Sequence, residues 1–206
     1  DTIKLVPHKR YTVSSIDLYT NFDPRVQNAK YKQLQYNSID FLYRNRLNIK
    51  PKVLNKRLDY KPGEYYNHSK VESAFKRLSG LGLFKIIHID FEMDTSNGRS
   101  EQLRSIVELE PTKTKTFTME SDGTRTGEAL GIEGSVVFTN KNLFRKAIKG
   151  EVSFTGGIEA QKTVVQTDQN DPSNNLSGIA SSFNTLELSP RTSLSIPSYL
   201  LRFTRL

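Results

Sequence analysis

PKVLNKRLDYKPGEYYNHSKVESAFKRLSGLGLFKIIHIDFEM, residues 51–93, is the stretch that decides the fold. Pro51 predicts the start of a short helix, because the N–H that proline lacks has no helical partner at that position. Three apolar residues then share one face of this helix, namely Val53, Leu54 and Leu58. The residues Lys61-Pro62-Gly63-Glu64 predict a turn that ends the segment.

A second helix is predicted between this turn and the glycines that follow it. Ser69 and Glu72 have the spacing of a capping box, which marks a helix N-terminus. The residues at helical spacing that predict its buried stripe are Val71, Ala74, Phe75 and Leu78. Gly80 or Gly82 ends the helix. A half-buried strand follows, because polar residues alternate with the apolar residues Ile87, Ile89, Phe91 and Met93.

Further strands are predicted on either side of this stretch. Residues 2–6 and 11–19 have strand character, and in 102–110 one face carries Leu103, Val107 and Leu109. Residues 21–48 show no single period, and we interpret them as an insertion with a short helix or strand. Strands 11–19, 84–93 and 102–110, with both helices on one side, predict a small α+β unit.

The second half of the chain has a different pattern, with long alternating runs in 130–139, 148–159 and 186–196. Their apolar positions are Leu130, Ile132, Val136, Phe138, Ile148, Val152, Phe154, Ile158, Leu186, Leu188, Leu194 and Ile196. The runs approach or reach the 9–11 residues of a tilted membrane-spanning strand. An antiparallel sheet of a soluble sandwich gives the same alternation, and the pattern alone favours that alternative.

Composition bears mainly on which kinds of site are available. The 206 residues include no Cys and three His, which argues against a thiolate or histidine metal site. No sequence motif for catalysis or phosphate binding is present, so we expect no enzyme. The net charge is +8, and one basic patch consists of Arg44, Arg46, Lys50, Lys52, Lys56, Arg57 and Lys61. These residues form either a binding surface for phosphate groups or, as such charge runs usually do, a solvated face.

The residues KPGEYYN (61–67) before the second helix and LGLFK (81–85) after it resemble the POTRA domain of the BamA/TamA outer-membrane assembly superfamily. The order of the remaining strands resembles a TamA-like member, with the start of its surface-antigen barrel. The resemblance implies an α+β POTRA domain (β-α-α-β-β) followed by the all-β antiparallel strands of an incomplete transmembrane β-barrel. It divides the chain into the end of a preceding POTRA unit (1–10), a POTRA domain (11–111) with the insertion at 21–48, and the first barrel strands (112–206).

The same resemblance implies the function of a factor that inserts or exports β-barrel or surface proteins by strand pairing. Its partners are unfolded outer-membrane clients, accessory envelope assembly proteins and outer-membrane lipid, with no cofactor, metal or nucleic acid. Its location is the bacterial outer membrane, with the POTRA domain in the periplasm. The client-binding edges are expected at Phe84, Ile86, His88, Asp90, Thr116, Phe117, Thr118, Met119 and Glu120.

Two other classes of function remain open on the sequence. One is a soluble periplasmic or surface protein-binding module whose second half is an ordinary sandwich. The other is a nucleic-acid-binding domain that uses the basic patch, although few aromatic residues are interleaved with its cations.

Overall fold

The computed structural model describes residues 9–26, 29–95, 101–126, 129–160 and 185–197, so the strand expected at 2–6 lies outside it. The chain forms two units. The first comprises Asp1–Thr114, Lys141–Ile148 and Ile196–Leu206, and the second comprises Lys115–Asn140 and Lys149–Ser195. No helix in the described part of the chain is long and apolar enough to span a membrane.

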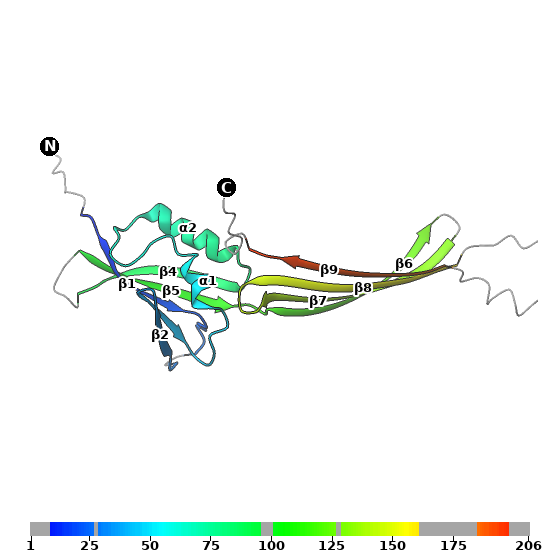
Figure 1. Cartoon of the computed structure of the whole chain (residues 1–206), viewed down its shortest axis with the longest axis horizontal. Helices are drawn as coiled ribbons and strands as arrows, with labels where there is room; N and C mark the ends of the chain where they lie inside the picture. The colour runs from blue at the N-terminus through cyan, green and yellow to red at the C-terminus, as the bar shows by residue number, and fades with distance from the viewer. Residues whose placement is uncertain (1–8, 27–28, 96–100, 127–128, 161–184, 198–206) are drawn as a thin grey trace, which may run out of the picture. The chain divides into compact units, whose positions relative to one another are not determined.

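The first unit is built on a five-stranded sheet with the strand order β2-β3-β1-β5-β4. Its strands are β1 (Thr12–Tyr19), β2 (Lys32–Tyr36), β3 (Ile39–Tyr43), β4 (Phe84–Met93) and β5 (Gln102–Pro111). β1 pairs in parallel with both β3 and β5, whereas β2–β3 and β4–β5 are antiparallel pairs. Two helices, α1 (Pro51–Asn55) and α2 (His68–Ser79), lie between β3 and β4 in the chain, and α2 packs against β4 (Figure 1).

The element order of this unit, β-β-β-α-α-β-β, differs from the expected β-α-α-β-β. The difference arises in the insertion, where β2 and β3 form a hairpin that joins the sheet beside β1. Its turn consists of Asn37 and Ser38, whose φ angles of 49° and 60° are those of a tight hairpin turn. No helical period was readable there because the segment forms two short strands.

The turn predicted at Lys61–Glu64 is confirmed, and it also anchors the first strand. The N–H of Glu64 donates to the oxygen of Lys61 at 3.2 Å, and Gly63 has a φ of 89°. Proline followed by a residue of positive φ is the geometry of a type II turn, which favours glycine. Two further backbone bonds join the turn to Val13 of β1. The N–H of Gly63 donates to the oxygen of Val13 at 2.8 Å, and the N–H of Val13 donates to the oxygen of Glu64 at 2.9 Å.

The capping box predicted for the second helix is wrong. Asn67 is the N-cap, and its side-chain oxygen accepts the N–H of Ser69 at 3.0 Å. Asparagine is among the best N-cap residues, and the helix begins two residues earlier than a cap at Ser69 would allow. Glu72 instead lies 4.0 Å from His68 on the helix surface.

The predicted buried stripe of α2 is wrong in one residue. Ala74 and Leu78 are buried and Val71 packs beside them, but the side chain of Phe75 is 45% exposed. Each helical residue is turned about 100° from the one before it. Phe75 therefore lies at the border of a contact face that centres on Ala74 and Leu78.

The core of the first unit lies between the helices and one face of the sheet. As predicted, α1 and the residues after it bury Val53, Leu54 and Leu58, and β5 buries Val107 and Leu109. In β4 the predicted alternation holds for Ile87, Ile89 and Phe91, which are partly buried against the core, but Met93 is 58% exposed at the strand end.

Tyr60 is the largest fully buried side chain in this core. Its hydroxyl lies 2.9 Å from the hydroxyl oxygen of Ser105, so the polar tip has a hydrogen-bond partner. Burial raises the pKa of Tyr60 to about 12, against a smaller opposing effect of the bond to Ser105. The phenol is therefore neutral in the folded chain at any physiological pH.

The second unit is a four-stranded sheet with the strand order β6-β7-β8-β9. The strands are β6 (Lys115–Thr126), β7 (Ala129–Leu143), β8 (Ile148–Ala160) and β9 (Thr185–Ser195). β6 pairs antiparallel with β7, and β8 with β9. Long strands run side by side in this sheet (Figure 1).

Candidate functional site

β4 forms one edge of the first sheet, and the four client-binding residues predicted in 84–90 all lie on it. A single backbone bond shows which way its peptide groups point. The N–H of Asp94 donates to the oxygen of Gln102 at 2.9 Å. Hydrogen-bonded pairs alternate along an antiparallel ladder, so in the register of His88 with Glu108 the even-numbered residues from 86 to 92 bond to β5. The register shifts between Phe84 and Ile86, so Phe84 does not follow this alternation.

The free edge of β4 therefore exposes the peptide groups of Ile87, Ile89 and Phe91, not those of His88 and Asp90. One of these outward groups is already occupied, because the N–H of Phe91 donates to Oδ1 of Asp90 at 2.8 Å. A side chain that caps an edge peptide reduces uncontrolled strand pairing. The uncapped part of the edge is centred on Ile87 and Ile89.

β6 forms an edge of the second sheet, and the residues predicted at 116–120 lie on it. The N–H of Lys141 donates to the oxygen of Thr114 at 2.8 Å, in the same register that pairs Phe117 with Phe138. By the same alternation, the peptide groups of Phe117 and Met119 point away from β7. Those of Thr116, Thr118 and Glu120 bond to β7.

One face of the second sheet is apolar and exposed. The register places one set of residues together on it, namely Phe117, Met119, Leu130, Ile132, Val136, Phe138, Val152, Phe154, Ile158, Leu186, Leu188 and Leu194. Among these, Met119, Leu188 and Phe154 are 71%, 72% and 63% exposed. All four described strands of the second unit belong to one sheet.

The opposite face of the same sheet is polar. On β8 and β9 it carries Lys149, Glu151, Ser153, Thr155, Glu159, Glu187, Ser189, Arg191, Ser193 and Ser195. The hydroxyl of Thr139 donates to Glu151 at 3.2 Å, which shows that this face continues from β7 to β8. Lys149 forms an ion pair with Glu151 at 3.0 Å. The sheet thus separates apolar from polar side chains across strands of 11–15 residues.

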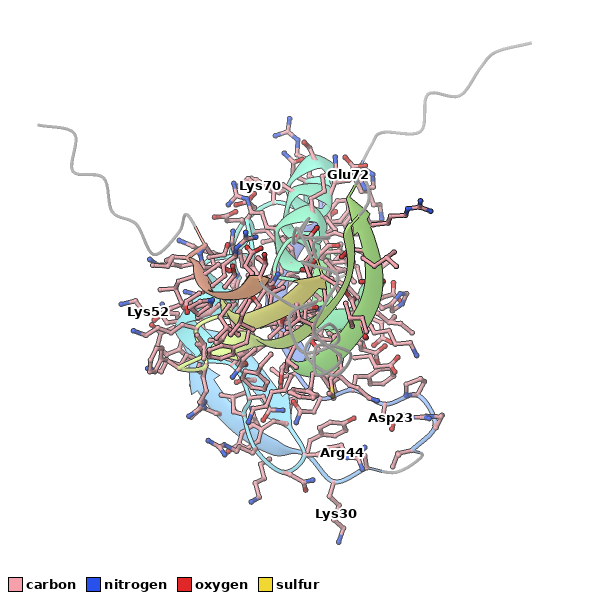
Figure 2. The ribbon with its side chains drawn as sticks, turned by 90° about the vertical axis from the view of Figure 1, so that its right-hand side faces the viewer. Asp23, Lys30, Arg44, Lys52, Lys70 and Glu72 are labelled. Atoms are coloured by element: carbon pink, nitrogen blue, oxygen red, sulfur yellow. The ribbon has the colours of Figure 1, made fainter. Side chains whose placement is uncertain are left out.

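Two residues of the predicted basic patch come from different elements. Arg44 follows β3, whereas Lys52 lies on α1, and Figure 2 shows the two residues well apart. The structure instead brings the segment 47–50 into contact with the turn 141–148, which belongs to the first unit and buries Ala147 in its core. This contact joins segments far apart in the sequence, and no local pattern predicts it.

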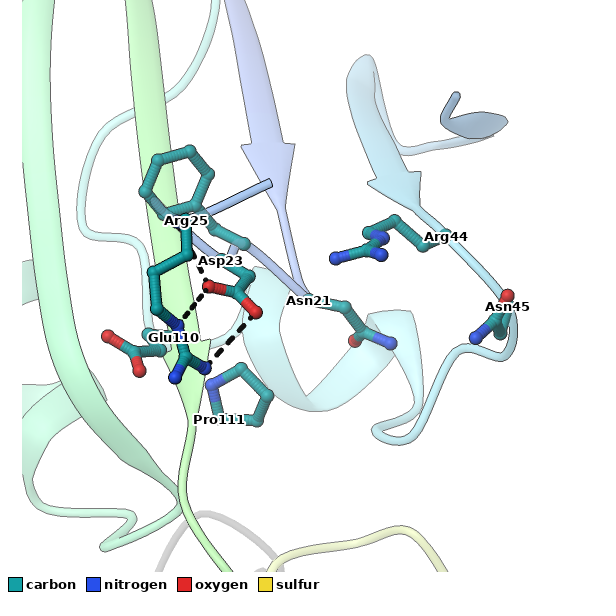
Figure 3. A pocket seen from close by; sticks show the side chains of 8 residues that line it. Asn21, Asp23, Arg25, Arg44, Asn45, Glu110 and Pro111 are labelled. Atoms are coloured by element: carbon teal, nitrogen blue, oxygen red, sulfur yellow. Dashed lines mark hydrogen bonds and ion pairs between the residues drawn. The ribbon is translucent and has the colours of Figure 1, made fainter. Parts of the chain in front are cut away.

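A polar pocket of about 290 Å³ lies at the carboxyl ends of the parallel strands β1, β3 and β5. Its lining residues include Asn21, Asp23, Arg25, Arg44, Asn45 and Glu110 (Figure 3). Nε of Arg25 and Oδ1 of Asp23 form a hydrogen-bonded ion pair at 3.0 Å. The hydrogen bond from Arg25 lowers the pKa of the Asp23 carboxyl group. The pocket can hold a polar group, but its lining holds no nucleophile with an adjacent base. In the described ranges no three metal-ligating side chains gather into a group.

Two features define this class of protein. The first is an α+β unit with a free sheet edge, and the second is a separate sheet with one apolar and one polar face. No protein-family model and no curated protein matches the sequence. The chain has partial similarity to solved structures whose descriptions name POTRA domains of Omp85, BamA and CdiB.

Three of these structures show how partial the similarity is. "POTRA1-3 of the periplasmic domain of Omp85 from Anabaena" is 16% identical over 50% of this chain, with a TM-score of 0.36. BamA from Haemophilus ducreyi lacking POTRA domains 1–3 is 11% identical over 65%, with a TM-score of 0.33. CdiB from Acinetobacter baumannii is 9% identical over 82%, with a TM-score of 0.39. The chain spans 35%, 33% and 48% of these three chains, respectively.

Proposed function

We propose that the chain is part of a BamA-like or TamA-like outer-membrane factor that inserts or exports β-barrel or surface proteins. In this proposal the first unit is a POTRA domain in the periplasm, and the second unit supplies the opening strands of a transmembrane β-barrel. The partners are unfolded outer-membrane clients, accessory envelope assembly proteins and outer-membrane lipid. No nucleotide or cofactor takes part.

The observation that carries this proposal is the two-faced second sheet. Its strands have the length that a tilted strand needs to cross a bilayer, and most side chains on one face are apolar and exposed. Soluble proteins rarely expose apolar patches larger than a few hundred Å². Lipid covers such a face without requiring a specific partner, and the polar face opposite suits a barrel interior.

Strand addition at free edges is the mechanism that follows from the backbone geometry. An extended client segment gains main-chain hydrogen bonds at an edge, with little demand on its own sequence. The outward peptide groups around Ile89 on β4 and Met119 on β6 are suited to this role. Because Phe117 and Met119 also expose apolar side chains, the β6 edge offers an apolar contact beside the backbone bonds.

Proline substitutions test this mechanism on one strand with a matched pair. In the full-length protein, Met119→Pro removes an outward N–H and should abolish crosslinking of a nascent barrel client to β6. Thr118→Pro removes a bond to β7 and should lower stability instead. Met119→Ala keeps the backbone donor and should leave most of the crosslinking. The 206 residues contain no Cys, so single cysteines at Phe117 and at the control positions Lys56 and Lys61 add the first thiols to this part of the protein.

Ile89→Pro and His88→Pro form the corresponding pair on β4, where the N–H of Ile89 is outward and that of His88 bonds to β5. Crosslinking that survives both Met119→Pro and Ile89→Pro would remove edge pairing as the mechanism. Crosslinks that appear only at Lys56 and Lys61 would place the client on the basic patch.

A further inference from the structure

The turn between β7 and β8 has an unusual backbone conformation. Phe144, Arg145 and Ala147 have φ angles of 56°, 60° and 55°, in the left-handed region that residues with a Cβ atom avoid. Positive φ is least favourable for a bulky residue such as Phe144. A strained conformation persists only where the surrounding contacts enforce it.

Four hydrogen bonds enforce this conformation. Asn142 makes two of them, because its amide nitrogen donates to the oxygen of Asn48 at 2.9 Å and its amide oxygen accepts the N–H of Ala147 at 3.0 Å. Arg145 makes two more with the segment 47–50. Its guanidinium donates to the oxygen of Leu47 at 2.6 Å, and its backbone oxygen accepts the N–H of Lys50 at 3.0 Å. Ala147 is only 5% exposed and belongs to the core.

The clamped turn presents an aromatic ring to solvent. Phe144 is 74% exposed, although the residues around it are fixed by hydrogen bonds and burial. A single exposed apolar residue has no meaning by itself. Here the strained backbone holds the ring of Phe144 in solvent, so the ring does not contribute to the packing of the first unit.

Both segments that meet at this turn are cationic. Six basic residues lie at or within two positions of the contacting residues, namely Arg46, Lys50, Lys52, Lys141, Arg145 and Lys146. Neither 45–52 nor 140–147 contains an acidic residue. Contact between two like-charged segments is unfavourable unless an anion or solvent screens it. In addition, Nε of Arg145 is buried with no hydrogen-bond partner in the described part of the chain.

We propose that Phe144 and these six basic residues, together called the Phe144 surface, bind the headgroup region of an anionic lipid bilayer. Aromatic rings favour the boundary between headgroups and acyl chains, and clustered Lys and Arg bind anionic headgroups. This inference rests on the proposed function, because a sheet in the bilayer is what brings the adjoining turn to the membrane surface. Phe144 inserts at shallow depth, and the basic residues bind headgroup phosphates.

Tryptophan fluorescence tests the proposal directly, since the chain contains no Trp. Three single variants of the whole chain are reconstituted into phosphatidylcholine vesicles, with and without phosphatidylglycerol. Phe144→Trp reports on the turn, Phe154→Trp on the apolar face of the second sheet, and Tyr65→Trp on a 64% exposed control position in the first unit. Lipids brominated near the headgroup or near the end of the acyl chain quench each tryptophan according to its depth.

The proposal predicts that Phe144→Trp is quenched by the shallow bromolipid, and more strongly when phosphatidylglycerol is present. Phe154→Trp should be quenched by the deep bromolipid, and Tyr65→Trp by neither. If Phe154→Trp is quenched while Phe144→Trp behaves like Tyr65→Trp, this inference is overturned and the proposed function stands. If no tryptophan is quenched, the second sheet is outside lipid and the proposed function fails as well.

A charge variant tests the anionic part of the proposal. Adding Lys52→Gln to the Phe144→Trp chain should weaken its apparent affinity for phosphatidylglycerol about fivefold, which corresponds to about one cation near an anionic surface. Its quenching in pure phosphatidylcholine should not change. Equal quenching in both lipids, unaffected by Lys52→Gln, would refute recognition of anionic headgroups.

Discussion

Two neighbouring apolar residues of α2 should differ sharply in what they contribute to stability. Leu78 is fully buried in the core, whereas Phe75 is 45% exposed. Leu78→Ala removes buried carbon atoms worth about 2 kcal/mol in transfer free energy and leaves a cavity, so we expect a total cost of about 3–4 kcal/mol. Phe75→Ala loses only the buried half of a phenyl ring and leaves a space open to water, so about 1–1.5 kcal/mol is expected.

The measurement is urea unfolding of the detergent-solubilised chain, followed by near-ultraviolet circular dichroism of the tyrosines, one of which is the buried Tyr60. Lys76→Ala on the exposed face of the same helix is the control and should change the free energy of unfolding by less than about 0.5 kcal/mol. A cost for Phe75→Ala that equals or exceeds that of Leu78→Ala would refute this account of the contact face of α2.

Two further predictions concern Tyr60 and Phe144. Because the folded chain keeps the Tyr60 proton up to about pH 12 while the unfolded chain loses it near pH 10, the free energy of unfolding should fall between these values, and Tyr60→Phe should reduce that slope in urea titrations. A slope unchanged by Tyr60→Phe would show that other groups cause it. Phe144→Gly should raise the free energy of unfolding by about 1 kcal/mol, because glycine adopts positive φ without strain, and Phe144→Ala, which retains the strain, should not.

Local patterns in the sequence predicted much of the first unit because the physical causes there are local. A Pro-Gly pair determines its turn by the φ angles that the two residues favour, and Gly63 has the positive φ expected. The alternation around Ile87 and Ile89 likewise follows from one buried face of a strand. The helix stripe failed at Phe75 because helical spacing indicates a broad arc, and the packing partners decide where within it the contact lies.

Long-range contacts account for most of what the sequence did not reveal. The hairpin of 32–43 joins β1 through a parallel pairing that no short window contains. The turn at 141–148 contacts residues 47–50 across more than 90 positions, through Asn142 and Arg145. Polar residues in a turn suggest only solvent exposure when read alone, so the Phe144 surface emerges only when both segments are placed together.

The two edges show why an alternating sequence identifies a face but not the direction of a peptide group. Side chains and peptide groups both alternate along a strand, and their relation depends on which pairs of the ladder are hydrogen-bonded. One bond, from Asp94 to Gln102, makes Ile89 an outward peptide on β4 although its side chain packs against the core. On β6 the outward peptide of Met119 carries an exposed apolar side chain. If the proposed strand addition takes place, a client at β4 would meet backbone flanked by His88 and Asp90, whereas at β6 it would meet backbone and apolar side chains together. We therefore expect apolar client strands to favour β6.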